Sequence, residues 1–169
     1  MDWKSRQPAS DYGPTSGVET EPDAEKSHSV VRMQMMMNPG NFAFAVTAAG
    51  SDGGRSPESF EDGTAIGFIG ITRPPEVFFL FGMACWGKGY ATEALEAFLA
   101  TYWSKFPNGL PQMGQEHKDI LQAYVVEENS GSSRVLEKTG FKQTGTALGQ
   151  IGDRKNVLER VYEIRRPAG

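Results

Sequence analysis

The chain has 169 residues, enough for one domain whose hydrophobic core needs neither a metal nor disulfides. Its 17 Lys and Arg stand against 21 Asp and Glu, and the resulting net charge of −4 disfavours nucleic acid as a partner. Cys85 is the single cysteine, no Cys/His cluster has the spacing of a zinc site, and no apolar run approaches the length of a membrane span. We therefore expect a cytoplasmic protein without a metal or a membrane anchor.

The N-terminal part of the chain, residues 1–20, is rich in Ser, Pro, Asp and Gly and has no apolar periodicity. We expect coil there and a single domain over residues 21–169. Thr20 is a suitable N-cap and is followed by an acidic residue and a proline in the first turn. These features predict a helix from this point to Met37, ended by the Asn-Pro-Gly sequence at 38–40.

Three strands are expected next along the chain. Apolar runs bounded by turn-forming residues indicate them, and they cover Phe42–Ala48, Thr64–Ile71 and Glu76–Phe81. A polar loop over residues 50–63 separates the first two, which favours a hairpin. The third strand is apolar on both alternating faces, as is typical of a central strand that is covered from both sides.

A helix that begins near Thr92 is the strongest element, because its apolar residues recur at the spacing of one buried face. A Pro-Asn-Gly sequence at 107–109 ends it. Four elements complete the chain: a strand over Ile120–Val126, a helix over Ser130–Thr139, and strands over Phe141–Thr146 and Val157–Ile164. This order predicts an α/β fold in which helices pack on a mixed sheet.

A loop with two glycines, Gly87 and Gly89, lies between the expected central strand and this helix. Glycine permits positive φ and close approach of the backbone to a ligand, so successive N–H groups can converge on phosphate oxygens. The helix dipole and Lys88 would add positive charge. The spacing fits neither a P-loop nor the GxGxxG dinucleotide motif. Taken alone, the loop could equally be an ordinary tight turn.

Two longer segments, Glu76–Leu95 and Glu128–Phe141, carry linked signatures. The first runs from a buried strand through the glycine loop into a helix, and the second contains Asn-x-x-Ser followed by Glu-Lys-x-Gly-Phe. Together they resemble the RimJ/RimL-like branch of the GNAT (Gcn5-related N-acetyltransferase) superfamily, over roughly Phe42 to the C-terminus. The resemblance implies a GNAT acyl-CoA acyltransferase fold with splayed central strands and flanking helices. It also implies transfer of an acetyl group from acetyl-CoA to a primary amine, on a protein N-terminus or a small molecule.

In that family the pantetheine arm of CoA lies between the two splayed central strands, and a glycine loop wraps the pyrophosphate. The loop maps onto Trp86, Gly89 and Ala91, with backbone amides of residues 87–92 as the expected donors. The cofactor-binding residues that the resemblance implies are Phe79, Phe81, Trp86, Gly87, Lys88, Gly89, Tyr90, Ala91, Thr92 and Asn129. Acetyl-CoA would be the cosubstrate, an amine the second substrate, and no metal is implied.

Direct attack of a neutral amine on a thioester needs a proton acceptor, and the departing thiolate needs a proton donor. Glu76 matches a glutamate that opens the fourth strand in this branch, and it is the candidate base; a solvated charge at a strand end is the alternative. Ser132 is the candidate proton donor, because Leu136 replaces the tyrosine that serves many GNAT enzymes. Asn129 matches an asparagine that meets the pantetheine, although Asn129 and Ser132 could instead cap the short helix.

The N-terminal region departs most from the family. Its members start with a strand and a helix that carry an Arg-Leu-x-Leu-Arg type sequence, and nothing before Phe42 resembles it. We therefore expect this strand and helix to be missing and the edge of Phe42–Ala48 to be unpaired, which favours a homodimer or low stability. Cys85 and Met83 also differ from the family, and Cys85 is expected to be a packing residue. Three functions stay open: an active enzyme, an inactive CoA-binding relative, and an interaction module.

Overall fold

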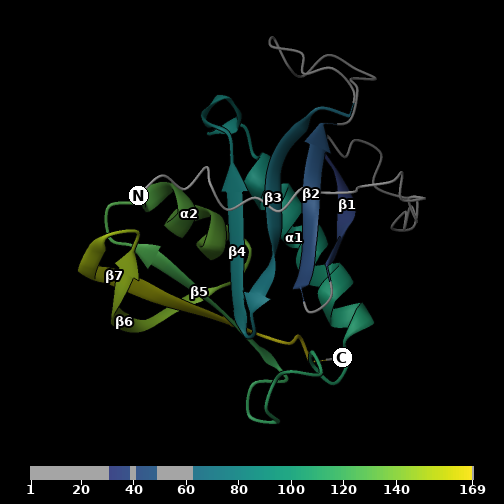
Figure 1. The fold of residues 1–169 in the computed structure, drawn as a ribbon. Coiled ribbons are helices and arrows are strands. Elements are labelled where there is room, and N and C mark those ends of the chain that lie inside the picture. The colour runs from purple at the N-terminus through teal and green to yellow at the C-terminus, as the bar shows by residue number, and fades with distance from the viewer. Residues whose placement is uncertain (1–30, 39–40, 49–62, 169) are drawn as a thin grey trace.

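The computed structural model describes residues 31–38, 41–48 and 63–168 (Figure 1). Its strands are Val31–Asn38 (β1), Asn41–Ala48 (β2), Ala65–Arg73 (β3), Glu76–Phe81 (β4), Ile120–Val126 (β5), Lys142–Ile151 (β6) and Arg154–Arg165 (β7). Within the described residues the α-helices are Tyr90–Lys105 (α1) and Ser130–Lys138 (α2), and a 3₁₀ turn over Met83–Cys85 follows β4. No helix among these residues is long and apolar enough to cross a membrane.

The strands form one sheet in the order β1-β2-β3-β4-β5-β7-β6. Neighbouring strands are antiparallel except β4 and β5, which are parallel and lie at the centre of the sheet. This confirms the predicted mixed α/β sheet and the central position of Glu76–Phe81. The two closing strands are longer than expected and meet in a tight turn, with Ile151 paired to Arg154.

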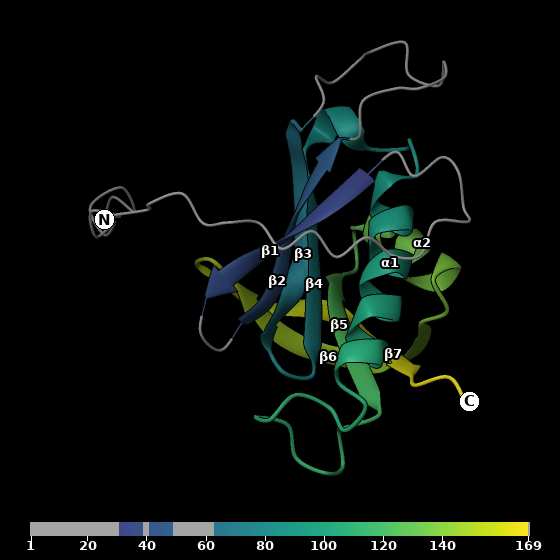
Figure 2. The ribbon, with the colours of Figure 1, turned by 90° about the vertical axis from the view of Figure 1, so that its right-hand side faces the viewer.

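Helix α1 covers one face of the N-terminal half of the sheet, and α2 lies beside it on the same side (Figure 2). The predicted apolar stripe of α1 is buried, with Leu95 and Phe98 fully inaccessible to solvent. Phe42 of β2 packs against this helix, with its ring centroid 5.5 Å from Phe98 and 4.9 Å from Phe106. The core therefore fixes how α1 lies against β4, the strand that precedes it in the chain.

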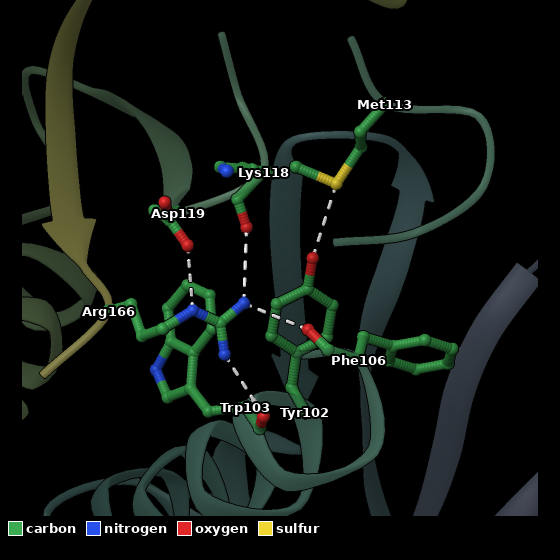
Figure 3. Close-up of polar contacts among 7 residues, drawn as sticks. All are labelled: Tyr102, Trp103, Phe106, Met113, Lys118, Asp119 and Arg166. Carbon is green, nitrogen blue, oxygen red and sulfur yellow. Dashed lines mark hydrogen bonds and ion pairs between the residues drawn. The ribbon is translucent and has the colours of Figure 1, made fainter. Parts of the chain in front are cut away.

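Arg166, just beyond β7, holds the C-terminal end of α1 (Figure 3). Its guanidinium donates to the backbone oxygens of Trp103 and Phe106 at 3.0 and 2.8 Å, and its carbon lies 4.6 Å from the Trp103 ring centroid. It also pairs with Asp119 at 2.8 Å and donates to the Lys118 oxygen at 3.3 Å. The last carbonyls of a helix lack partners within the helix, so Arg166 satisfies them and joins α1 to the segment before β5.

Strand β1 corrects two expectations about the N-terminal region. Residues 31–38 pair with β2 from Val31↔Ala48 to Asn38↔Asn41, so the predicted helix up to Met37 is wrong over these residues. The segment joining the two strands is only residues 39–40. Pro39 and Gly40, which the sequence indicated as the end of a helix, instead lie between two strands. Pairing of β1 with β2 outweighs the weak helical pattern of residues 31–37. The remainder of the predicted helix, and the coil expected over residues 1–20, lie outside the described residues.

The edge of the sheet is also not where it was expected. Because β1 pairs along the whole of β2, the expectation that Phe42–Ala48 is an unpaired edge strand is wrong. A strand does precede Phe42, and it is joined to β2 without an intervening helix. Among the described strands, β1 and β6 are the two outer strands of the sheet.

Candidate active site

The parallel strands β4 and β5 pair only where they begin. Glu76 is opposite Gln122, and the Gln122 N–H donates to the Pro75 oxygen at 3.0 Å. No further residues of the two strands are in register, and the strands diverge toward their C-terminal ends (Figure 1). This is the splayed arrangement that the family resemblance implies.

A cleft of about 230 Å³ lies between the diverging strands and is called the β4–β5 cleft below. Its lining residues come from β4, β5, β7 and the start of α2: Glu76, Val77, Phe78, Phe79, Ala123, Tyr124, Val125, Val126, Asn129, Ser132 and Glu159. Both candidate catalytic residues, Glu76 and Ser132, therefore lie in one cleft together with the candidate cofactor-binding residues Phe79 and Asn129. Residues more than fifty positions apart in the sequence are brought together by the parallel strands.

The backbone of β4 presents hydrogen-bonding groups to this cleft. The Gly82 N–H donates to the Ile66 oxygen of β3 at 3.2 Å, so residue 82 directs its backbone groups toward β3. The backbone groups of successive residues along a strand point to opposite neighbouring strands. Residues 79 and 81 therefore direct their N–H and C=O groups toward β5. The Phe81 oxygen already accepts from the Trp86 indole N–H at 2.9 Å, while the Phe81 ring is buried. Phe79 is thus the residue of β4 whose backbone is best placed to pair with an extended ligand.

The glycine loop adopts the conformation that its sequence indicates. Gly87 and Gly89 have φ of 72° and 89°, in the region that favours glycine. The Gly89 oxygen accepts the N–H of Glu93 at 3.0 Å, so Gly89 caps the start of α1. A β-carbon added at either glycine would meet nothing within 4 Å, so the loop has open space beside it. The first amides of α1 point along the helix axis toward this space.

Glu76 stands where β4 and β5 meet. Its side chain is 28% exposed, and its Oε1 is 3.0 Å from the guanidinium of Arg73, which is 80% exposed. Arg73 and Glu76 face each other across the turn between β3 and β4. The carboxylate is therefore held in one orientation by a partner that solvent reaches easily, while its second oxygen remains able to accept a proton or a hydrogen bond.

Asn129 has the capping role that was weighed against cofactor binding. Its Oδ1 accepts the Ser132 N–H at 3.1 Å, which satisfies an amide in the first turn of α2. Both residues also line the β4–β5 cleft. The cap uses the oxygen of Asn129 and the backbone of Ser132, so the Asn129 NH₂ group and the Ser132 hydroxyl retain hydrogen-bonding capacity for a ligand.

Sequence reasoning missed a polar chain beside Glu76. The Tyr124 hydroxyl donates to Gln122 Oε1 at 3.3 Å, and Gln122 Nε2 donates to Glu163 Oε1 at 2.8 Å. The alternation in β5 carried the signal: Leu121, Ala123 and Val125 are buried, which places the intervening Gln122 and Tyr124 on the opposite face of the strand.

Cys85 is a packing residue, as expected. Its side chain is 5% exposed and belongs to the hydrophobic core. Burial raises the pKa of the Cys85 thiol, and the positive charge of Lys88 offsets only part of that effect. The thiol is therefore protonated at neutral pH and is a poor nucleophile. In the described part of the chain, no group of three or more His, Cys, Asp or Glu residues could hold a metal ion.

Comparisons with solved structures identify the same fold in other proteins. An acetyltransferase of the GNAT family from Bacillus anthracis is 22% identical, with TM-score 0.54, over 73% of this chain and 65% of that chain. The ribosomal-protein-S5-alanine acetyltransferase from Vibrio fischeri is 17% identical, with TM-score 0.55, over 75% and 62%. A microcin C7 self-immunity acetyltransferase in complex with acetyl-CoA and AMP is 11% identical, with TM-score 0.55, over 75% and 61%. This chain thus spans less than two thirds of the length of each.

A comparison with curated proteins found no match. The model of the acetyltransferase (GNAT) domain family, however, matches residues 2–142, which is most of the chain. The match begins well before Phe42, where the sequence resemblance was expected to start. With the splayed central strands and the glycine loop before α1, it shows that the chain belongs to the GNAT acetyltransferase family.

Proposed function

We propose that this protein is an N-acetyltransferase that moves an acetyl group from acetyl-CoA to a primary amine in a ternary complex. The observation that carries the proposal is the β4–β5 cleft, which opens toward the C-terminal ends of two parallel strands. The glycine loop follows β4 and the start of α2 follows β5, so both lie at this end of the cleft. Ligands of α/β proteins bind where the carboxyl ends of parallel strands separate.

The cofactor-binding residues proposed here are those implied by the family: Phe79, Phe81, Trp86, Gly87, Lys88, Gly89, Tyr90, Ala91, Thr92 and Asn129. The amides of Gly87 to Thr92 and the α1 dipole would hold the pyrophosphate, because both favour an anion at a helix N-terminus. The pantetheine arm would pair with the backbone of Phe79 in the cleft. Support comes from the acetyl-CoA bound to a protein of the same fold. Because the Phe81 oxygen already accepts from the Trp86 indole and the Phe81 ring is buried, Phe81 could offer a cofactor only its backbone N–H.

The proposed reaction is a direct displacement. The amine nitrogen attacks the thioester carbonyl carbon, Glu76 or a water that it holds takes the proton from nitrogen, and the carbon–sulfur bond breaks. The leaving thiolate takes a proton from the Ser132 hydroxyl, which solvent then restores. The position of Glu76 at the start of the cleft and of Ser132 at the start of α2 supports two groups acting from different sides of the thioester.

A second function is an inactive relative that still binds CoA. The observation that favours it is the direct connection of β1 to β2, because the family resemblance assigns acceptor recognition to N-terminal helices and loops. The two functions differ in turnover and agree in cofactor binding. The acceptor of the active form would be a primary amine on a protein, as the name of the Vibrio fischeri ribosomal-protein-S5-alanine acetyltransferase indicates for that enzyme, or on a small molecule.

The test is a calorimetric titration of the full chain with acetyl-CoA, followed by a screen for release of the CoA thiol with polyamines, amino acids and peptides. Binding together with release that depends on an amine is the expected result. Binding without release by any amine would favour the inactive relative. No binding would contradict both functions and leave an interaction module that kept the fold.

A further inference from the structure

The polar chain Tyr124–Gln122–Glu163 begins beside Glu76 in the β4–β5 cleft. Glu76 and Gln122 are the one pair of residues in register between β4 and β5, and Tyr124 is the next outward-facing residue of β5. Tyr124 lines the cleft and is 39% exposed. These three hydrogen-bonded residues therefore connect the proposed site of reaction to β7.

The chemistry of Glu163 fixes the direction of every hydrogen bond in the chain. A carboxylate only accepts hydrogen bonds, so the Gln122 amide must turn its NH₂ group toward Glu163, 2.8 Å away. The amide oxygen then faces Tyr124, and the Tyr124 hydroxyl must donate to it at 3.3 Å. The Tyr124 oxygen accepts no hydrogen bond from any residue that the structure describes. Its lone pairs are therefore available to a ligand in the cleft, while its proton is not.

Two hydrogen-bond acceptors thus line one cleft: the Glu76 oxygen not held by Arg73, and the Tyr124 oxygen, whose partner Gln122 is in register with Glu76. A neutral primary amine has two N–H groups, one for each acceptor, and its lone pair then remains free to attack. A secondary amine or an alcohol has one hydrogen on its nucleophilic atom and can satisfy only one acceptor. The unsatisfied acceptor would be desolvated without a partner when the site closes on such a substrate.

We propose that Tyr124, together with Glu76, binds the nucleophilic amine and selects primary amines over secondary amines and alcohols. This inference rests on the proposed acetyltransferase function. Tyr124 contacts the substrate by accepting one N–H, and Glu76 receives the proton that leaves. Gln122 and Glu163 are positioning residues, because they keep the Tyr124 proton turned away from the substrate. Ser132 remains the proton donor to the thiolate.

Two analogues in which CoA is joined to a mimic of the acceptor test this inference at equilibrium, without knowledge of the natural acceptor. One carries a CH₂–CO–NH–propyl group on the CoA sulfur, and the other carries the matching CH₂–CO–O–propyl ester. They differ in the one N–H, which Tyr124 or Glu76 can accept. Wild-type protein should bind the amide more tightly than the ester by about two- to tenfold, the effect of one neutral hydrogen bond. In Tyr124→Phe, where Glu76 is the one acceptor left, this preference should be smaller.

Three further variants separate contact from positioning. Tyr162→Phe is the matched control, since the Tyr162 hydroxyl bonds Glu137 of α2, and it should keep the amide preference. Glu163→Gln should also keep it, because a glutamine oxygen can still accept from Gln122. Glu163→Met should weaken the preference by freeing the Gln122 amide to turn. Equal affinity of wild-type protein for both analogues, or an unchanged preference in Tyr124→Phe, would overturn the inference. Failure of both analogues and of acetyl-CoA to bind would instead overturn the proposed function.

Discussion

Single side chains at the start of the β4–β5 cleft decide the proposed chemistry. Glu76 lies at the one point where β4 and β5 pair, so its position is set by strand pairing rather than by a loop. Its carboxylate is partly exposed, and a proton taken from a substrate can therefore pass to solvent. The exposed Arg73 partner orients this carboxylate but contributes little stability, as is usual for surface ion pairs.

Replacement of Glu76 tests the role of this carboxylate. Glu76→Gln should lower kcat by about a hundredfold, because general base catalysis contributes on the order of 10² or more. The dissociation constant for acetyl-CoA should not change, since Glu76 is proposed to contact the amine rather than the cofactor. Steady-state kinetics and calorimetry measure the two quantities. Glu96→Gln, at an exposed position of α1, is the control and should leave both unchanged. A parallel loss of binding and turnover would show that Glu76 is structural.

At the residue scale, the sequence identified candidates but could not assign every role. Glu76, Phe79, Asn129 and Ser132 were all expected in the site, and the structure brings them together in one cleft. Asn129 is the N-cap of α2, the alternative that the sequence left open and that its 3.1 Å contact with the Ser132 amide establishes. Tyr124 went unnoticed because its neighbours Gln122 and Glu163 come together only through pairing of β5 with β7.

At the scale of secondary-structure elements, α1 connects the glycine loop to the rest of the molecule. Its N-terminus forms the proposed pyrophosphate site, its middle packs on the sheet, and its C-terminus is held by Arg166. A helix fixed at its far end and along its length presents its first amides in a constant direction, which lowers the cost of ordering a binding site.

Removal of Arg166 should destabilise the fold. Arg166→Ala should lower the free energy of unfolding by about 2–4 kcal/mol, because several charge-assisted hydrogen bonds to backbone oxygens are lost together. Arg166→Lys should recover only part of this, since an ammonium cannot reproduce the planar fork of a guanidinium. Urea unfolding of the variants measures the change. Arg165→Ala, at the exposed neighbouring position, is the control. A similar small effect for Arg165→Ala and Arg166→Ala would contradict the assigned role.

Elements with strong local signals were predicted correctly. The apolar stripe of α1 is buried, and α2 ends at Lys138, one residue before the expected Thr139. Gly140 follows with φ of 93°, and the Phe141 N–H donates to the Leu136 oxygen at 3.0 Å. The first strand was missed because the possible N-cap at Thr20 favoured a helix through this segment, although Val31, Met33, Met35 and Met37 alternate with mostly polar residues. Its conformation is decided by pairing with β2, which is information from outside the segment.

At the scale of the whole molecule, β1 and β6 are the outer strands of the sheet that the structure describes, and their outer edges are where a second chain could pair. The expected self-association rested on an unpaired Phe42–Ala48 edge, and β1 now occupies that place. The outer side of β1 pairs with no other strand in the described part of the chain. Such an edge favours pairing with a second copy, so size-exclusion chromatography with light scattering should show a dimer. A monomer at every concentration would contradict this prediction.

Acetyl-CoA should stabilise the folded protein. A ligand that binds only the folded state adds about 2.7 kcal/mol at one hundred times its dissociation constant. For a chain of this size that corresponds to a rise in melting temperature of roughly 5–10 °C, measurable in a thermal scan. ATP at the same concentration has phosphates but no pantetheine arm, and it should give a much smaller rise. Equal effects of the two ligands would indicate that only charge is recognised, and no effect of either would argue against a cofactor site.

Binding of acetyl-CoA at the glycine loop is the central claim, and a pair of substitutions at Gly89 tests it most directly. Asn and Asp have nearly the same size and both tolerate the positive φ of Gly89, so they differ mainly in charge. Calorimetric titration should show a modest loss of acetyl-CoA affinity in Gly89→Asn and near-complete loss in Gly89→Asp, because a carboxylate would face the pyrophosphate at the helix N-terminus. Equal affinities of the two variants, close to that of the wild type, would contradict the placement of the cofactor.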